Sequence, residues 1–104
     1  MKKLIPLVLL LFSGNSVAQV AGVVIADHYT CNASDRIVIE TRMGLTNAEV
    51  YRGYSDTHEG DVLTGDLHSY GFTEIYKDGD EVGRIYVDDY MVSESTASDW
   101  CFNR

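Results

Sequence analysis

Two stretches rich in aromatic and β-branched residues, 72–77 and 82–92, flank the four residues Asp78-Gly79-Asp80-Glu81. Asp-Gly is a pair that favours a tight hairpin turn, because the central residues of such a turn adopt positive φ angles. The run Arg84-Ile85-Tyr86-Val87 is aromatic and β-branched, as expected of a half-buried strand. The sequence therefore predicts an antiparallel β-hairpin in its C-terminal half.

A second strand is predicted over residues 36–42. Ile37, Ile39 and Thr41 fall on one face of this segment, and Val38 shares the other face with charged residues. Residues 20–26 are also small and β-branched. We expect all of these segments to pair in one sheet system.

The segment between these strands is open to two interpretations. Residues 43–47 are expected to turn the chain, and residues 48–54 to form a further strand. Alternatively, Thr46 and Glu49 have the spacing of a helix capping box. We favour the strand, because Gly53 follows too soon for more than about one helical turn.

Turn signals recur along the whole chain. Residues 55–61 are polar throughout, residues 65–71 carry a glycine at each end, and residues 93–99 are expected to be a polar connection. No segment of ten or more residues has a convincing helical periodicity. The predicted fold is therefore all-β: a small antiparallel barrel or sandwich of about six strands.

The first eighteen residues have the features of an export signal. Lys2 and Lys3 precede an apolar run, and Ser16-Val17-Ala18 supplies the small residues that a signal peptidase accepts. The apolar run is far shorter than the roughly 20 residues that span a bilayer. We expect a signal peptide over residues 1–18, a single β domain over residues 19–104, and a periplasmic or secreted product. An uncleaved membrane anchor is the alternative.

The sequence contains two cysteines, Cys31 and Cys101. Export would place them in an oxidising compartment, where a small domain gains stability from a disulfide. Free thiols or half of a metal site are the alternatives, but neither cysteine has C-x-x-C spacing. We therefore expect one disulfide that closes nearly the whole mature chain.

The charge balance restricts the partners. The chain has 16 acidic and 8 basic residues, a net charge of −8, and loss of Lys2 and Lys3 would leave 6 against 16, or −10. Binding to nucleic acid or to an anionic membrane needs clustered Lys and Arg, which are absent. A basic protein is the partner that this charge favours. The alternative is that the charge serves only solubility.

Candidate catalytic and metal motifs are weak. His58 lies among acidic residues, but polar loops of an acidic protein produce such neighbours by chance. The residues 78–81 resemble only half of a calcium loop. His68 and Ser69 would be the residues of a small hydrolase, but no Gly-x-Ser-x-Gly frame surrounds them. We expect no enzyme activity, no metal and no cofactor.

Three short motifs resemble the bacterial inhibitors of c-type lysozyme (the MliC/PliC group). Tyr29-Thr30-Cys31 is similar to the Tyr-x-Cys entry of that family, Lys77-Asp78-Gly79-Asp80-Glu81-Val82 to its Lys-Gly-Asp-Glu-Ala stretch, and Cys101 to its second cysteine. Ser69-Tyr70-Gly71-Phe72 stands where the family has Ser-Gly-x-x-Tyr.

The resemblance implies a barrel-like fold and inhibition of lysozyme by occlusion of its active cleft. Ser69 would enter the cleft, Lys77 would reach the catalytic carboxylates, and Asp80 and Glu81 would also contact the partner. The alternative function is a non-enzymatic structural or interaction protein of the bacterial envelope.

Overall fold

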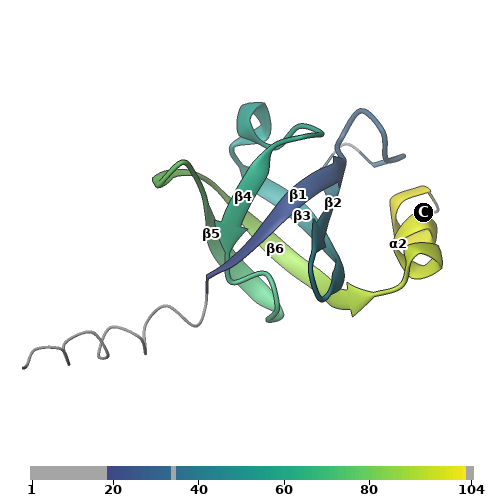
Figure 1. Ribbon diagram of the computed structural model, residues 1–104. Coiled ribbons are helices and arrows are strands. Elements are labelled where there is room, and N and C mark those ends of the chain that lie inside the picture. Colours follow the sequence, from purple (N-terminus) through teal and green to yellow (C-terminus); the bar gives the residue numbers. More distant parts are fainter. Residues whose placement is uncertain (1–18, 34, 103–104) are drawn as a thin grey trace, which may run out of the picture.

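The computed structural model describes residues 19–33 and 35–102 (Figure 1). The predicted signal peptide, residues 1–18, lies outside this part of the chain. Six strands form a closed antiparallel barrel in the order β1-β2-β3-β6-β5-β4, and one helix packs on its outside. The elements are β1 (Val20–Ala26), β2 (Arg36–Thr41), β3 (Gly44–Arg52), a 3₁₀ helix η2 (Tyr54–Asp56), β4 (Val62–Gly65), β5 (Gly71–Lys77), β6 (Asp80–Val92) and α2 (Glu94–Phe102).

The barrel consists of two three-stranded meanders, β1-β2-β3 and β4-β5-β6. Pairing of β3 with β6 and of β1 with β4 joins the two meanders and closes the cylinder. The prediction of about six antiparallel strands is confirmed, and of the two architectures it allowed, the barrel is the one formed. None of the helices in the described residues is long and apolar enough to cross a membrane.

The side chains of β2 alternate between the inside and the outside of the barrel, as predicted, and those inside belong to the hydrophobic core. Ile37 and Ile39 are fully buried inside the barrel, where they pack with inward-facing residues of the other strands. Val38 points to the outside and is nevertheless only 3% exposed, because α2 covers it. The interior cluster comprises Val24, Ile37, Ile39, Ala48, Val50, Leu63, Leu67, Ile75, Ile85 and Val87.

A second, smaller cluster lies between the barrel wall and α2. It contains the predicted disulfide, which joins Cys31 to Cys101 with a Cα–Cα distance of 4.6 Å. Val38 and Ala97 pack with the two cysteines, and the partly buried Trp100 packs against this cluster. The disulfide therefore ties the loop that follows β1 to the helix near the end of the chain.

The expectation of a polar connection over residues 93–99 is wrong, because most of that segment belongs to α2. The hydroxyl of Ser93 accepts a hydrogen bond from the N–H of Thr96 at 3.2 Å and caps the helix. Only Ala97 and Cys101 are buried in the nine-residue helix. Within residues 93–99 Ala97 is the only apolar residue, so that segment alone has no apolar stripe that would predict a helix.

The predicted turn over residues 43–47 is also wrong. The turn consists of Arg42 and Met43, and β3 begins at Gly44, which pairs with Thr41. Thr46 lies inside the barrel and donates a hydrogen bond to the carbonyl of Leu67 at 3.1 Å. A polar residue satisfied inside the barrel looks like turn material in the sequence, which explains the error. The capping-box helix is excluded by the same strand.

The hairpin at Asp78-Gly79 is confirmed. Lys77 pairs with Asp80 across the turn, and Asp78 and Gly79 have φ angles of 55° and 88°. The turn is two residues long rather than four, so Asp80 and Glu81 already belong to β6. Both side chains are exposed at the tip of this hairpin.

Candidate functional site: the acidic end of the barrel

Three connections meet at one end of the barrel, because the strands alternate in direction. They are the loop between β1 and β2, the loop between β3 and β4, and the tight turn between β5 and β6. In Figure 1 the first two lie at the top of the barrel and the turn between β5 and β6 lies at its upper left. We call this region, which comprises residues 27–33, 52–61 and 77–81, the acidic end.

The acidic end carries almost half of the carboxylates of the chain. Its seven acids stand against two bases, Arg52 and Lys77, which gives a net charge of −5 with histidine neutral. Both bases are already paired: Arg52 lies 2.8 Å from Glu81, and Lys77 lies 3.1 Å from Asp61. The acids are Asp27, Asp56, Glu59, Asp61, Asp78, Asp80 and Glu81.

The buried carboxylate of Asp27 holds two of the loops together. Its Oδ1 accepts the N–H of Tyr29 at 2.8 Å, and its Oδ2 accepts the N–H of Glu59 at 3.0 Å. Burial alone would raise the pKa of Asp27, but the N–H groups of Glu59 and Tyr29, together with His28, outweigh it and lower the pKa. Asp27 is therefore ionised in the folded protein and anchors the loop after β1 to the loop after β3.

Asp61 links the turn between β5 and β6 to the loop between β3 and β4. Its Oδ2 accepts the N–H of His58 at 2.9 Å, and its Oδ1 accepts a hydrogen bond from the ammonium of Lys77. Burial opposes the charge of Asp61, but these two hydrogen bonds lower its pKa overall. The same contact raises the pKa of Lys77. The end of β5 is thus fixed to the loop between β3 and β4.

Four rings form an aromatic cluster on the acidic end: His28, Tyr29, Tyr54 and His58. His28 lies in the middle, with its ring centre 4.4 Å from that of Tyr29, 5.5 Å from Tyr54 and 5.2 Å from His58. Tyr29 and His58 are nearly parallel, at 10° and 5.9 Å. Tyr29 is 81% exposed. Packed rings on an acidic surface suit recognition of a cationic side chain.

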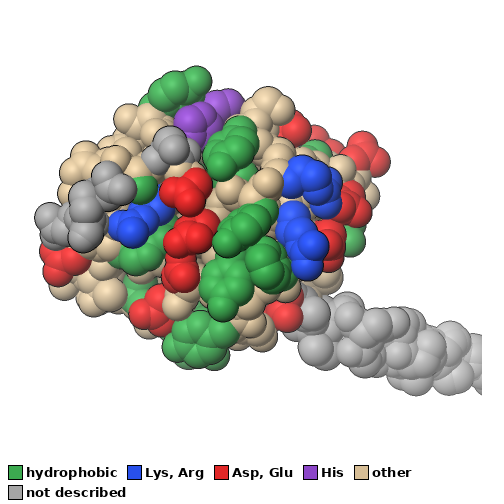
Figure 2. Space-filling view, turned by 180° about the vertical axis from the view of Figure 1, so that it is seen from behind, with side chains coloured by type: hydrophobic (Ala, Val, Ile, Leu, Met, Phe, Trp, Pro, Cys, Tyr) green, Lys and Arg blue, Asp and Glu red, His purple; other side chains and the backbone are tan. Residues whose placement is uncertain are grey.

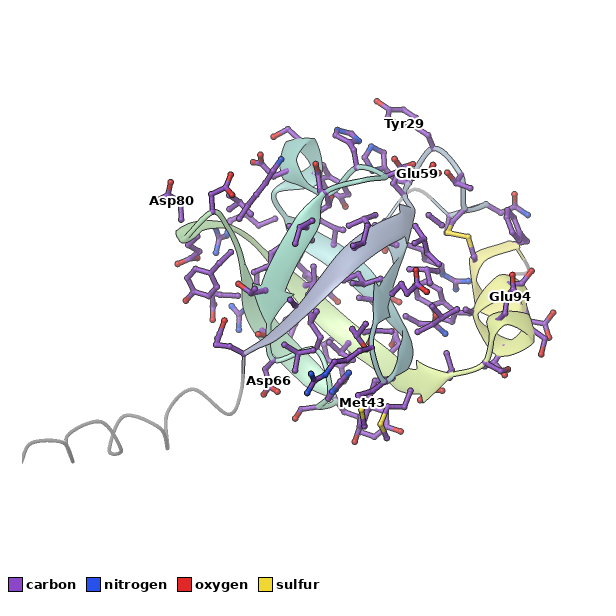
Figure 3. The ribbon with its side chains drawn as sticks, in the orientation of Figure 1. Tyr29, Met43, Glu59, Asp66, Asp80 and Glu94 are labelled. Atoms are coloured by element: carbon purple, nitrogen blue, oxygen red, sulfur yellow. A yellow bond between two sulfur atoms is a disulfide. The ribbon has the colours of Figure 1, made fainter. Side chains whose placement is uncertain are left out.

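The structure separates the residues that the sequence analysis proposed for one site. Lys77, Asp80 and Glu81 lie on the acidic end, but Ser69 lies in the loop between β4 and β5, at the opposite end. In Figure 3, Asp80, which follows the turn between β5 and β6, lies above Asp66, which begins the loop that contains Ser69. The six residue steps of β5 span about 20 Å. Ser69 and Lys77 therefore do not meet at one point.

The opposite end has its own contacts. Nε2 of His68 lies 2.9 Å from the hydroxyl of Thr41, and the ring of His68 stacks at 6.1 Å on Tyr90. The hydroxyl that engages this histidine nitrogen is thus that of Thr41, whereas a hydrolase would need Ser69 there. Ser69 itself is exposed.

A second exposed surface lies on the outside of β3, β5 and β6. Phe72 and Tyr86 pair across the strands, and their rings meet edge to face at 4.9 Å. Tyr51 packs on Phe72 in the same way, and the guanidinium of Arg84 lies 4.4 Å from the Phe72 ring centre. Figure 2 shows hydrophobic side chains gathered beside Lys and Arg side chains on this face.

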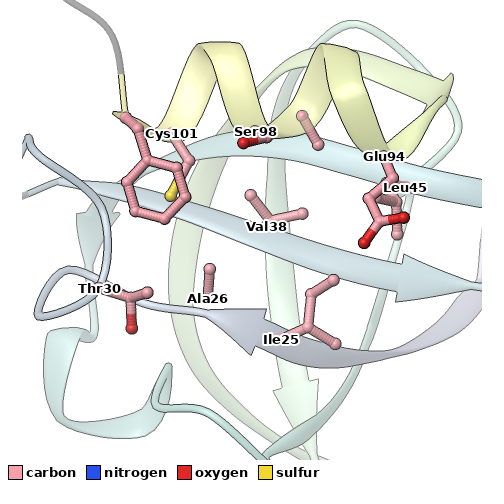
Figure 4. Close-up of a pocket in the computed structure, with 10 residues that line it drawn as sticks. Ile25, Ala26, Thr30, Val38, Leu45, Glu94, Ser98 and Cys101 are labelled. Atoms are coloured by element: carbon pink, nitrogen blue, oxygen red, sulfur yellow. The ribbon is translucent and has the colours of Figure 1, made fainter.

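An apolar pocket lies between α2 and the barrel wall (Figure 4). Val38, Leu45 and Ala97 line it, and Thr30, Glu94 and Ser98 contribute its polar groups.

In residues 19–33 and 35–102, no group of three or more His, Cys, Asp or Glu side chains is arranged to hold a metal ion. The acidic end combines a net negative charge with the exposed rings of Tyr29 and Tyr54, and we take it as the candidate binding surface.

Sequence reasoning missed the role of Asp27 and of the aromatic cluster. The spacing Asp27-x-Tyr29 is a signal that could have found the first, because an Asp side chain commonly accepts the N–H two residues later. The cluster joins residues about 30 positions apart, and only the barrel brings them together.

No family model, curated protein or solved structure matches this chain.

We expect Asp27→Asn to destabilise the domain by about 1–3 kcal/mol at neutral pH, because a buried acceptor of several hydrogen bonds is replaced. The folded-state pKa of Asp27 is lowered, so its contribution is complete above the unfolded-state pKa and is lost as pH falls through the folded-state pKa. The difference between variant and wild type should shrink below about pH 4. Urea unfolding at several pH values measures it. Exposed Asp78→Asn, the control, should change stability by less than about 0.5 kcal/mol.

Proposed function

We propose that this chain is an exported domain that binds a basic protein, and that its target is a c-type lysozyme whose active cleft it occludes. The observation that carries the proposal is the acidic end, where seven carboxylates face two bases that are already paired. Opposite charge accelerates encounter and selects partners. The inhibitor needs neither catalysis nor a cofactor, since it acts by covering the cleft.

Export is part of the same proposal. A disulfide between Cys31 and Cys101 persists in an oxidising compartment, and the expected signal peptide would deliver the chain there. The resemblance of three short motifs to the lysozyme inhibitors supplies the target. Two of them, Tyr29-Thr30-Cys31 and the stretch from Lys77, lie wholly or partly on the acidic end.

The geometry favours docking through the acidic end. Lys77, Asp80 and Glu81 are together there, and Lys77 would exchange Asp61 for a carboxylate of the enzyme. Ser69 would serve a different mode, in which the opposite end enters the cleft. Lys77→Ala and Ser69→Ala distinguish the two modes, because each should weaken inhibition only in its own.

The direct test is lysis of bacterial cell walls by lysozyme in the presence of the mature protein. We expect a near-equimolar amount to slow lysis, and Lys77→Ala to weaken the effect while Ser69→Ala leaves it intact. If Ser69→Ala weakened inhibition and Lys77→Ala did not, the binding site would instead be the loop between β4 and β5. Undiminished lysis with excess mature protein would refute lysozyme as the target, and would favour the alternative of an envelope interaction protein.

We further expect Asp78→Asn/Asp80→Asn to slow association with lysozyme about 5-fold at low salt, because both exposed carboxylates steer the encounter. The difference should nearly vanish at 1 M salt, where charges are screened beyond about 3 Å. Glu40→Gln/Glu94→Gln removes two exposed charges outside the acidic end and is the matched control. Equal slowing by both variants, measured by stopped-flow, would show that only net charge matters.

A further inference from the structure

Tyr29 presents a ring that its own fold does not cover. Its backbone N–H is held by Asp27 at 2.8 Å, and its ring packs 4.4 Å from His28, yet the residue is 81% exposed. Figure 3 shows Tyr29 projecting away from the barrel, with Glu59 below it. A large ring fixed at its base and open to solvent provides a stacking surface.

Glu59 is tied to the loop of Tyr29 through Thr30, the next residue in the sequence. A carboxylate oxygen of Glu59 accepts a hydrogen bond from the hydroxyl of Thr30, and its backbone N–H donates to Asp27 at 3.0 Å. The loop that carries Tyr29 and the loop that carries Glu59 are thus joined at two points. Because these groups are already ordered, a ligand would pay little conformational entropy to use them.

The net negative charge of the acidic end favours a cationic ligand for the aromatic cluster. The two bases of the acidic end, Lys77 and Arg52, are paired with Asp61 and Glu81, so neither neutralises Glu59. A guanidinium is planar, stacks on aromatic faces and donates in a fork that matches a carboxylate. An ammonium offers neither the flat face nor the fork.

We propose that Tyr29 and Glu59 form a docking site for an arginine side chain of a basic partner protein. The guanidinium stacks on the outward face of Tyr29 and donates hydrogen bonds to Glu59. The inference deepens the proposed function and rests on its claim that the acidic end faces a basic protein. It does not depend on that protein being lysozyme.

The test is a titration of the ¹⁵N-labelled mature domain with a hexapeptide of arginine, followed by NMR. We expect amide shifts at Tyr29, Thr30 and Glu59, and none with a hexapeptide of citrulline, which is neutral and nearly isosteric. Tyr29→Leu should weaken binding about 5-fold, and Tyr29→Phe should retain it, because the ring and not the hydroxyl stacks. Tyr70→Leu, at the opposite end, is the matched control.

Equal affinity of Tyr29→Leu and Tyr70→Leu for the arginine peptide would overturn the site, as would equal shifts with citrulline. Peptide binding and inhibition of lysis are separate readouts. An arginine site that depends on Tyr29 without any inhibition would refute lysozyme as the target and leave the site standing. Inhibition with no binding of the arginine peptide would refute the site and leave the proposed function standing.

Discussion

Replacement of both cysteines, Cys31→Ser/Cys101→Ser, is expected to lower the free energy of unfolding by about 4 kcal/mol. The bridge spans 70 residues, and in the loop-entropy model a closure of that length removes about this much free energy from the unfolded chain. A domain of about 86 residues is stabilised by only about 4–13 kcal/mol in total. The variant should therefore lose at least about a third of its free energy of unfolding, and all of it if the wild type lies at the low end of this range.

The loss has a second source in the folded state. The helix α2 has nine residues, and a helix of that length is marginal in water without tertiary packing. The disulfide holds it against Val38, whose side chain faces away from the barrel interior. Without the bridge, α2 should detach readily and expose this side chain.

Urea unfolding of the oxidised wild type, the reduced wild type and the double serine variant measures the effect. We expect the last two to coincide, because reduction and replacement remove the same constraint. Hydrogen exchange should show loss of protection in α2 before the barrel strands. A difference below about 1 kcal/mol between oxidised protein and variant would contradict the loop-entropy argument.

The sequence was sufficient for the parts of the fold that depend on local signals. Asp78-Gly79 predicted the hairpin, and the alternation in β2 predicted which side chains fill the barrel. The two cysteines predicted the disulfide, because with only two thiols a single pairing exists. Each of these signals acts over a few residues or leaves one solution.

The errors arose where tertiary contacts replaced local preference. Thr46 and Asn47 are buried in β3, although polar residues in that position suggested a turn. Val38 occupies an outward position that is apolar because α2 covers it. The candidate site depends on tertiary structure in the same way. Lys77, Asp80 and Glu81 share one end of the barrel, whereas Ser69 lies before β5 and therefore at the other end.

A glycine in β6 provides the second large effect. Gly83 has no positive φ angle, so its backbone would tolerate any residue, but a Cβ there would lie 2.2 Å from the carbonyl oxygen of Arg52. It would also lie 3.1 Å from the Cα of Gly53. These atoms are backbone and cannot rotate away as a side chain would. We expect Gly83→Ala to destabilise the domain by about 3 kcal/mol through overpacking alone.

Gly79→Ala is the informative comparison, because the constraint there is of the opposite kind. Gly79 has a φ of 88°, and a Cβ added to it would meet no atom within 4 Å, so alanine would bear only the cost of a left-handed backbone, about 1 kcal/mol. Urea unfolding of both variants separates space from conformation as the reason for glycine. Since Gly83 lies where β3 leaves the barrel, its replacement should also displace the loop of residues 53–61 and weaken any binding by the acidic end. Equal destabilisation by the two variants would show that β3 and β6 separate easily at this point.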